Sequence, residues 1–325
     1  MVALKRSQLL FITGNRVGDA VLSTGILAHF LAERPGASVT VACGPLPAPL
    51  FADLPGLARI VPIVKAKRRR IGHWIALRHS LSGQKWDDVI DLRSAFFAWT
   101  VRAERRWVCR AEKRHEHRVE ELARQLGVAP PPAPHLWLSP EREARVARLV
   151  DDRPLLAIGP TANWGGKRWP AERFAQLALA LTGPGGMLEG ARVMVLGATQ
   201  ERDSALPLLQ ACTDPLDWVG DHDLLDVFAL LRHARMFIGN DSGLMHMAAA
   251  AGIPTLGLFG PSADWRYRPW APLGAVVRTP ESLEQLTSGV DYDYRSHRSL
   301  MTGLSVARVQ DAALDLWRRA RGDTL

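Results

Sequence analysis

Short apolar runs without internal alternation recur along the whole chain, and segments with helical periodicity lie between them. Strands are predicted at 9–13, 38–43, 59–64, 88–93, 154–160, 191–197, 235–240 and 255–260. Helices are predicted at 19–34, 115–126, 170–181, 201–212, 225–234 and 306–320, with one more in the alanine-rich stretch after 240. Strands that are apolar on both faces are typical of parallel sheets covered by helices on both sides. The pattern therefore predicts an α/β fold.

The alternation occurs twice, and the most proline-dense stretch of the chain, "VAPPPAPHLWLSP" (128–140), separates the two halves. Prolines stiffen a connector and are excluded from helix interiors. We therefore expect two Rossmann-like domains, 1–150 and 151–325, that face each other across a cleft into which the carboxyl ends of the strands point. The closing helix 306–320 can pack on its own domain or back on the first.

The excess of positive charge lies in the N-terminal half of the chain. Residues 1–150 carry 24 Lys and Arg against 13 Asp and Glu, a net charge of +11, and the remainder carries 17 against 20, a net charge of −3. Much of the excess lies in "KAKRRR" (65–70) and in 102–118. A basic half predicts contact with an anionic substrate or surface, although solvated charged faces explain such runs equally well.

The segment "IGNDSGLMHMAAAAGIPTLGLFGPS" (238–262) places polar residues between a strand and a helix. Asp241 and Ser242 are natural N-caps, and Gly243 permits close approach to the backbone. The free amides and the positive dipole end of such a helix form an anion site, which His246 is close enough to reach. The alternative is an ordinary capped helix with His246 satisfied in the core.

Three further loops follow predicted strands. "TGNRVGDAV" (13–21) puts Asp19 at a strand-to-helix turn, where it acts either on a ligand in the cleft or only as an N-cap. "GPTANWGGKRWP" (159–170) offers Lys167 to a phosphate, unless that lysine is merely solvated. Glu201, in "VLGATQERD" (195–203), is suited to ribose hydroxyls or to the dipole of the next helix.

Several familiar sites are absent or weak. The glycines after the first strand follow neither the dinucleotide nor the Walker spacing, and no G-x-S-x-G elbow occurs. No His or Cys set has zinc spacing, and the acidic pairs in 221–223 and 291–293 lie in turn-like contexts, so no metal site is predicted. No apolar run is long enough to span a membrane or to form a signal-peptide core. Three scattered cysteines fit a reducing cytoplasm.

The motifs together resemble glycosyltransferase family 9, the ADP-heptose:lipopolysaccharide heptosyltransferases. The matching stretches are "GNRVGDAVLSTGIL", "GPTANWGGKRWPAERFAQLA", "VMVLGATQERD" and "NDSGLMHMAAAAGIPTLGLFGPS", in the family's order and over nearly the whole chain. The resemblance implies a GT-B fold and the inverting transfer of a heptose from a nucleotide-diphosphate donor, ADP-heptose, to a lipid-linked glycan. The first domain is then expected to bind the acceptor and the second the donor, with no cofactor and no essential metal.

Individual roles come from the same resemblance. It makes Asp19 the base, Lys167 a contact to donor phosphate with Thr161 on the same loop, and Glu201 a contact to ribose. It assigns the diphosphate and sugar to Asp241, Ser242, Gly243 and His246. Two stretches depart from the family pattern. The first motif has Asn15-Arg16-Val17 where a Leu-Gly-Asp form is common, and the turn at 264–270 reads "DWRYRPW". Both departures leave the sugar and the acceptor open.

Other functions remain to be weighed. A nucleotide-sugar epimerase of the same fold and a transferase that uses another nucleotide sugar are the nearest rivals. A nicotinamide-dependent oxidoreductase lacks its fingerprint, and no nucleic-acid-binding motif accompanies the basic half. The expected partners are thus the donor, an anionic lipid-linked glycan acceptor and the surface of the inner membrane. The enzyme is expected to be cytoplasmic, with peripheral membrane attachment as a further possibility.

Overall fold

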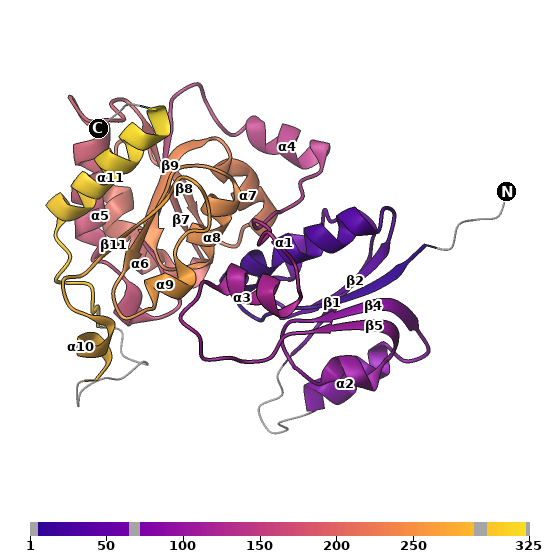
Figure 1. Ribbon diagram of the computed structural model, residues 1–325. Coiled ribbons are helices and arrows are strands. Elements are labelled where there is room, and N and C mark those ends of the chain that lie inside the picture. The colour runs from indigo at the N-terminus through magenta and orange to yellow at the C-terminus, as the bar shows by residue number, and fades with distance from the viewer. Residues whose placement is uncertain (1–5, 65–71, 289–297, 323–325) are drawn as a thin grey trace. The chain divides into compact units, whose positions relative to one another are not determined.

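The computed structural model describes residues 6–64, 72–288 and 298–322 (Figure 1). The basic run 65–70 and the acidic pair in 291–293 lie outside these residues. The chain divides into two compact units, Met1–Ser139 and Pro140–Leu325. This boundary precedes the predicted one after residue 150, because the first helix after the connector, α4 (Pro140–Ala147), packs against α7 (Leu224–Leu231) of the second unit.

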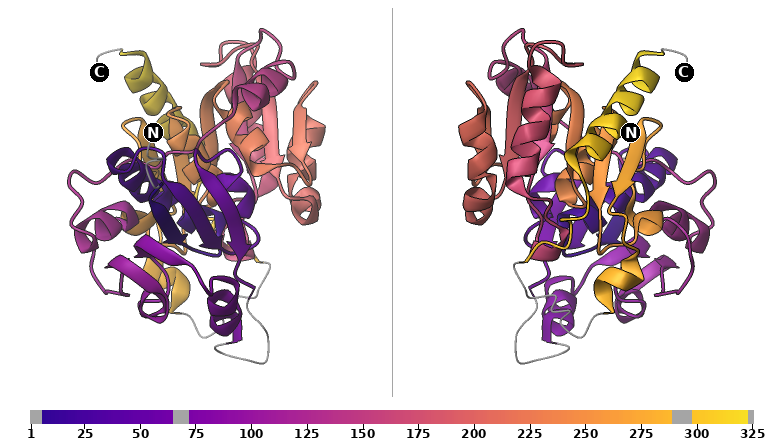
Figure 2. Two further views of the ribbon diagram at one scale, coloured as in Figure 1. Left: turned by 90° about the vertical axis from the view of Figure 1, so that its right-hand side faces the viewer. Right: turned by 90° about the vertical axis from the view of Figure 1, so that its left-hand side faces the viewer.

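The first unit is built on a parallel sheet with strand order β3-β2-β1-β4-β5. Its strands are β1 (Gln8–Ile12), β2 (Ser38–Cys43), β3 (Leu57–Pro62), β4 (Lys85–Asp91) and β5 (Arg102–Val108). One face is covered by α1 (Val17–Glu33) and α3 (Arg118–Gln125). The other carries α2 (Gly72–Ser80) and the short 3₁₀ helix η2 (Phe97–Thr100), whose side chains share one core cluster. Figures 1 and 2 show α2 on the opposite side of the sheet from α1 and α3. A second 3₁₀ turn, η1 (Ala48–Phe51), follows β2.

The proline-rich connector packs along α1 rather than running free. The backbone N–H of His135 donates to Thr24 Oγ1 (2.9 Å), and that of Ser139 donates to Asp53 Oδ2 (2.7 Å). The connector passes so close to α1 that a Cβ on Gly25 would lie 2.5 Å from the carbonyl oxygens of Pro132 and Ala133. These contacts place the connector in the first unit.

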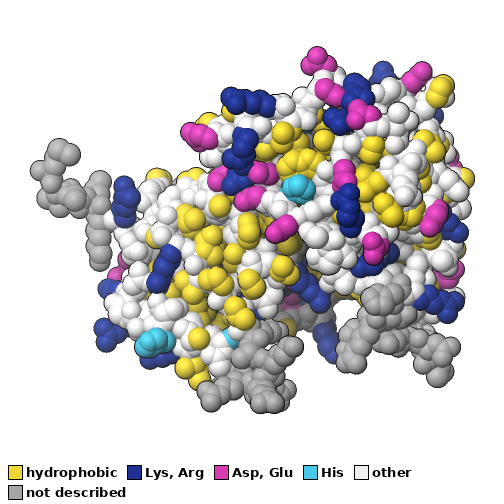
Figure 3. All heavy atoms as spheres, turned by 180° about the vertical axis from the view of Figure 1, so that it is seen from behind, with side chains coloured by type: hydrophobic (Ala, Val, Ile, Leu, Met, Phe, Trp, Pro, Cys, Tyr) yellow, Lys and Arg dark blue, Asp and Glu magenta, His cyan; other side chains and the backbone are white. Residues whose placement is uncertain are grey.

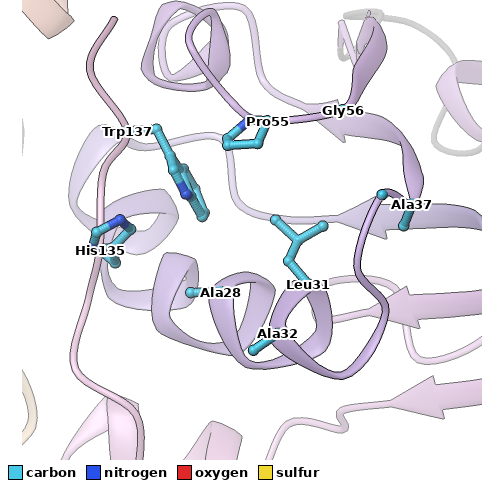
Figure 4. Close-up of a pocket in the computed structure, with 9 residues that line it drawn as sticks. Ala28, Leu31, Ala32, Ala37, Pro55, Gly56, His135 and Trp137 are labelled. Carbon is cyan, nitrogen blue, oxygen red and sulfur yellow. The ribbon is translucent and has the colours of Figure 1, made fainter. Parts of the chain in front are cut away.

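A pocket of about 420 Å³ lies between the connector and α1 (Figure 4). Leu31, Pro55 and Trp137 are among the side chains that line it. Ala37 and Gly56, which also line it, stand directly before β2 and β3. The pocket therefore belongs to the amino edge of the sheet, whereas the candidate residues of this unit lie at the carboxyl edge.

The second unit has a six-stranded parallel sheet of order β11-β10-β9-β6-β7-β8. Its strands are β6 (Leu155–Gly159), β7 (Arg192–Gly197), β8 (Leu216–Val219), β9 (Ala234–Asn240), β10 (Thr255–Phe259) and β11 (Gly274–Arg278). Besides α4 and α7 its helices are α5 (Ala171–Thr182), α6 (Arg202–Ala211), α8 (Gly243–Ala250), α9 (Asp264–Tyr267), α10 (Leu283–Thr287) and α11 (Val306–Arg321), with the 3₁₀ turns η3 (Gly165–Lys167) and η4 (Thr199–Glu201).

The closing helix α11 packs within its own unit, against α5, β10 and β11. Val309, Ala313 and Leu316, spaced at helical intervals, are fully buried in the same core as the side chains of α5 and α6. The contacts of the closing helix, which the sequence left open between the two domains, are therefore those of an ordinary covering helix of the second sheet.

Each sheet has one point at which the strand order reverses. In the first unit the chain builds outward from β1 through β2 to β3 and then returns to place β4 on the other side of β1. In the second unit it builds from β6 through β7 to β8 and returns to place β9 on the other side of β6. At such switch points the loops leave in opposite directions, so the carboxyl ends of β1 and β4, and of β6 and β9, border natural ligand sites.

The sign of the stability change in Gly25→Ala tests whether the connector passes close to α1. Helix propensity alone predicts a gain of about 0.5–1 kcal/mol for alanine inside α1. The collision with two carbonyl groups predicts instead a loss of about 1–3 kcal/mol, because the connector must move. Urea unfolding followed by circular dichroism measures the difference, with His29→Ala on the same helix as the control. A stabilised Gly25→Ala protein would contradict this packing.

Candidate functional site

The candidate donor residues of the second unit gather at the switch point of its sheet. Two loops border it: residues 160–170 follow β6, and residues 241–242 lead from β9 into α8. Four of the predicted residues come from these loops, Thr161, Lys167, Asp241 and Ser242, and two more, Gly243 and His246, come from the first turns of α8. Glu201 lies on the neighbouring loop, after β7.

Lys167 and Asp241 form an ion pair across the switch point. Lys167 Nζ lies 2.5 Å from Asp241 Oδ2, and the two side chains are 22 % and 6 % exposed. The alternative of a solvated loop lysine is therefore wrong. A carboxylate this deeply buried requires a cation or hydrogen-bond donors, and the pairing supplies both. The pair places one positive and one negative group at the amino end of α8.

Asn240, the last residue of β9, holds the loop that carries Lys167. Its side chain is fully buried, with Oδ1 accepting from the backbone N–H of Trp169 (3.0 Å) and Nδ2 donating to the carbonyl oxygen of Pro160 (2.8 Å). Both ends of the loop are thereby fixed to β9. Sequence reasoning gave this residue no role, although an amide at the end of an apolar strand was a usable signal.

The amino end of α8 has the features of an anion site. Ser242 is the N-cap residue, in an extended conformation, yet its hydroxyl makes no capping hydrogen bond. Its Oγ is buried and has no hydrogen-bond partner in the described part of the chain. Gly243 opens the helix, and His246, 4 % exposed, lies one turn further on. The first-turn amides and the helix dipole stabilise an anion by about 0.3–1 kcal/mol at an exposed site.

Thr161 and Glu201 are held by the neighbouring strand β7. Thr161 is 1 % exposed, and its methyl group would lie 3.2 Å from a Cβ placed on Gly197. Glu201 Oε2 accepts from the backbone N–H of Ala198 (3.1 Å), and its Oε1 lies 4.0 Å from Arg168 NH2. Glu201 therefore fixes its own turn while keeping one oxygen near a cation. The contact with Arg168 was not foreseen from the sequence.

Asp19 lies in the first turn of α1, not at its cap. The N-cap residue is Arg16, so the interpretation of Asp19 as only an N-cap is wrong. The Asp19 side chain is half-buried, and its carboxylate makes no hydrogen bond or ion pair among the described residues. A Cβ on Gly14 would lie 2.8 Å from that of Asp19, so glycine is needed for this close turn. The carboxylate is available as a proton acceptor.

The loop after β4 borders the switch point of the first sheet, at which the Asp19 turn also lies. Sequence analysis gave this loop no role. Asp91 is fully buried and accepts from the backbone N–H groups of Arg93 (3.1 Å), Ser94 (2.8 Å) and Ala98 (3.3 Å). Ala95 has φ +62°, a left-handed conformation that costs free energy for a residue with a Cβ. The backbone N–H of Leu92 donates to the carbonyl oxygen of Ile12 (3.0 Å), which fixes the loop to the end of β1.

One of the two acidic pairs has a structural explanation. Asp223, in the pair at 221–223, is the N-cap of α7 and accepts from the backbone N–H of Leu225 (2.8 Å). It also lies 3.1 Å from Arg142 NH1 of α4. Over residues 6–64, 72–288 and 298–322, no group of three or more His, Cys, Asp or Glu side chains is arranged to hold a metal ion.

The family model and the curated relatives agree on one family. The model of glycosyltransferase family 9 (heptosyltransferase) matches residues 74–289. Lipopolysaccharide heptosyltransferase 2 of Salmonella typhimurium is 26 % identical over 335 residues, covering 90 % of this chain and 94 % of its own length.

Solved structures show the fold. A family 9 glycosyltransferase from Veillonella parvula has a TM-score of 0.78 at 21 % identity, over 98 % of this chain and 99 % of its own. The ADP-heptose lipopolysaccharide heptosyltransferase II of Escherichia coli has a TM-score of 0.74 at 21 % identity, over 97 % and 99 %. The predicted GT-B fold of two Rossmann-like parallel-sheet domains is confirmed.

The ion pair at the switch point makes a testable contribution to stability. Lys167→Met leaves the buried Asp241 carboxylate without its cation, which is expected to cost about 1–3 kcal/mol. Adding Asp241→Asn removes the uncompensated charge, so the double variant is expected to recover much of the loss. Differential scanning calorimetry measures both effects. Arg153→Met, which breaks an exposed pair with Asp151, serves as the control and is expected to change little. Equal stability of Lys167→Met and the wild type would refute the coupling.

Proposed function

The chain belongs to glycosyltransferase family 9, and on this premise we propose that it transfers a heptose from ADP-heptose to a sugar of the lipopolysaccharide core. The second unit binds the donor and the first binds the acceptor. The observation that carries the proposal is the Lys167–Asp241 ion pair at the amino end of α8. It unites a cation and free backbone amides where a diphosphate would need both.

The donor residues contact different parts of the nucleotide sugar. The diphosphate lies against the α8 amides, the Ser242 hydroxyl and Lys167, with Thr161 on the adjoining loop. Glu201 accepts hydrogen bonds from the ribose hydroxyls, and Asp241 and His246 contact the heptose. The Ser242 hydroxyl is buried and has no partner among the described residues, which supports this arrangement, because a polar group at a ligand site is satisfied when the ligand is bound.

The reaction follows from these groups in one displacement. The acceptor hydroxyl oxygen attacks C1 of the heptose, its proton passes to the Asp19 carboxylate, and the bond from C1 to the diphosphate oxygen breaks. The configuration at C1 inverts, and ADP leaves with an added negative charge that Lys167 and the α8 amides stabilise. One carboxylate suffices, because a single displacement has one proton to remove.

The rivals are separated by what they require. A nucleotide-sugar epimerase needs no acceptor, whereas membership of a transferase family implies one. Another nucleotide sugar keeps the ribose and the diphosphate and differs at the base or the sugar, so donor preference is decided by assay. The proposal assigns neutralisation of the diphosphate to the protein's own groups and includes no cofactor.

A transfer assay tests the activity directly. We expect heptose to appear on a core-oligosaccharide acceptor with ADP-heptose as donor, with the anomeric configuration inverted by NMR, and with activity retained in EDTA. Other nucleotide sugars in parallel reactions define the donor preference. Isomerisation of the donor without acceptor would establish the epimerase instead, and loss of transfer in EDTA would add a metal to the mechanism.

Asp19→Asn tests the base. General-base assistance contributes about 10²–10⁴-fold to rate, so kcat is expected to fall by that factor. ADP affinity is expected to stay within about twofold, because Asp19 belongs to the other unit. Steady-state kinetics and calorimetric titration with ADP provide the two readouts. Glu33→Gln, at the far end of α1, is the control, and an Asp19→Asn enzyme with full turnover would remove Asp19 from the mechanism.

The first unit also presents a surface suited to a membrane. Exposed apolar side chains occur on α2 and around η2: Ile75 (62 % exposed), Phe96 (48 %) and Trp99 (66 %). Trp74 and Phe96 are in ring contact at 5.6 Å, and the Arg106 guanidinium stacks on Trp99 at 5.3 Å. Aromatic rings beside cations suit an interface of anionic lipid.

Figure 3 shows hydrophobic side chains gathered on the first unit, at the left of that view, with basic side chains toward the margin. No helix in the described ranges is both long and apolar enough to cross a bilayer. All three cysteines are free, which fits a reducing compartment. We therefore propose a cytoplasmic enzyme that attaches peripherally to the inner membrane through α2 and η2.

Vesicle sedimentation tests the attachment. The variant Ile75→Ser/Trp99→Ser is expected to lose most of its binding to vesicles that contain phosphatidylglycerol, because burying each apolar side chain contributes about 1.5–3 kcal/mol. Binding of the wild type is expected to weaken as salt rises. Leu179→Ser, an exposed apolar residue of α5 in the second unit, is the control. Binding that is independent of both the variant and salt would exclude this surface.

A further inference from the structure

The terminal nitrogens of Arg93 are buried and have no hydrogen-bond partner among the described residues. The residue is half-buried, and both terminal nitrogens are inaccessible and make no hydrogen bond with any described residue. Other arginines of the first unit have carbonyl or carboxylate partners. Arg106 donates to three carbonyl oxygens, at 2.9, 3.0 and 3.0 Å. Arg34 and Arg105 share the buried carboxylate of Asp88.

Arg93 lies at the switch point of the first sheet. It follows Leu92, whose backbone is hydrogen-bonded to the end of β1. Its charge acts on Asp91 at the end of β4 and on Cys43 at the end of β2. Because β4 and β2 flank β1 on opposite sides, the guanidinium sits at the edge where β1 turns into α1. Asp19 stands in the first turn of that helix.

The nearest carboxylate does not neutralise Arg93. Asp91 is committed to the backbone of its own loop and to the Ser94 hydroxyl. Stacking of the guanidinium on the Trp74 ring at 5.2 Å offsets only part of the cost of desolvation. Burial accordingly lowers the pKa of Arg93. An arginine stays protonated even so, and its planar fork of five donors matches a carboxylate or a phosphate.

We propose that Arg93 binds an anionic group of the acceptor, a carboxylate or a phosphate, and thereby holds the acceptor hydroxyl at Asp19. The inference rests on the proposed function, since it names the chemistry of that function's acceptor. The loop is fixed by Asp91 and by Leu92, so only the arginine side chain must rotate off Trp74 to meet the ligand. The unsatisfied donors then gain the charge-assisted hydrogen bonds that the protein itself does not provide.

Acceptor binding without donor is the first test. The probe is a core oligosaccharide released from lipopolysaccharide that retains its sugar acids and phosphates, titrated calorimetrically into the full chain. Arg93→Gln is expected to raise the acceptor Kd about 10- to 100-fold, and Arg93→Lys by less, because the charge remains while the fork is lost. The Kd for ADP is expected to stay the same in both variants.

The second test uses modified acceptors to identify the anionic group. One sample is dephosphorylated and another has its carboxyl groups reduced. The wild type is expected to bind more weakly only to the sample that lacks the group bound by Arg93. To that sample, Arg93→Gln is expected to bind with the same Kd as the wild type. The same pattern is expected in kcat/KM for the acceptor, with KM for the donor unchanged.

Arg102→Gln is the matched control, because it removes one exposed positive charge from the first residue of β5. This residue lies at the amino edge of the sheet, whereas Arg93 lies at the carboxyl edge. Three outcomes would overturn the inference: Arg93→Gln that binds the intact acceptor as the wild type does, a loss that persists on both modified acceptors, or an equal loss in Arg102→Gln. A wild-type protein that neither binds the acceptor nor transfers heptose would instead reject the proposed function. Wild-type transfer with an unaffected Arg93→Gln would reject the role of Arg93 alone.

Discussion

The reversal of strand order in each parallel sheet is the constraint on which the rest of the molecule depends. A parallel sheet places every strand-to-helix loop at one edge, and the reversal separates two of those loops so that side chains from both can meet. In the second unit this edge brings Lys167 and Asp241 to 2.5 Å although 74 positions separate them in the sequence. In the first unit it places the Asp19 turn beside the loop that Asp91 organises. Neither arrangement arises from local structure.

The two switch points differ in whether a buried charge is paired within the protein. Asp241 is compensated within the protein by Lys167, so the proposed donor site is organised before any ligand arrives. Among the described residues, no carboxylate is hydrogen-bonded to Arg93, because the neighbouring Asp91 accepts from the backbone of its own loop. An internally paired charge favours a rigid site, whereas an unpaired one stores free energy that a complementary anion recovers. A transferase benefits from both, since it must hold a donor and select an acceptor.

The strands buried on both faces were predictable, whereas of the four edge strands the sequence showed only β3, predicted at 59–64. β1, β6, β9 and β10 lie inside their sheets and are nearly all apolar, so their sequences show them plainly. β5, "RAERRWV", is half exposed and was interpreted as a run of charge. β8 and β11 are short strands at the two edges of the second sheet and were missed as well. Exposure on one side removes the apolar signal that reveals a strand.

The sequence by itself determined the α/β class, the repeat of the pattern, and the loops that carry the polar residues, because periodicity and turn chemistry act over a few neighbouring positions. Tertiary structure alone decided which of those residues meet. It paired Lys167 with Asp241, excluded Asp19 from the cap of α1 and bound the connector to α1, and within the described residues it left the terminal nitrogens of Arg93 without a hydrogen bond. Those outcomes depend on strand order and on burial, which arise from contacts between positions far apart in the chain.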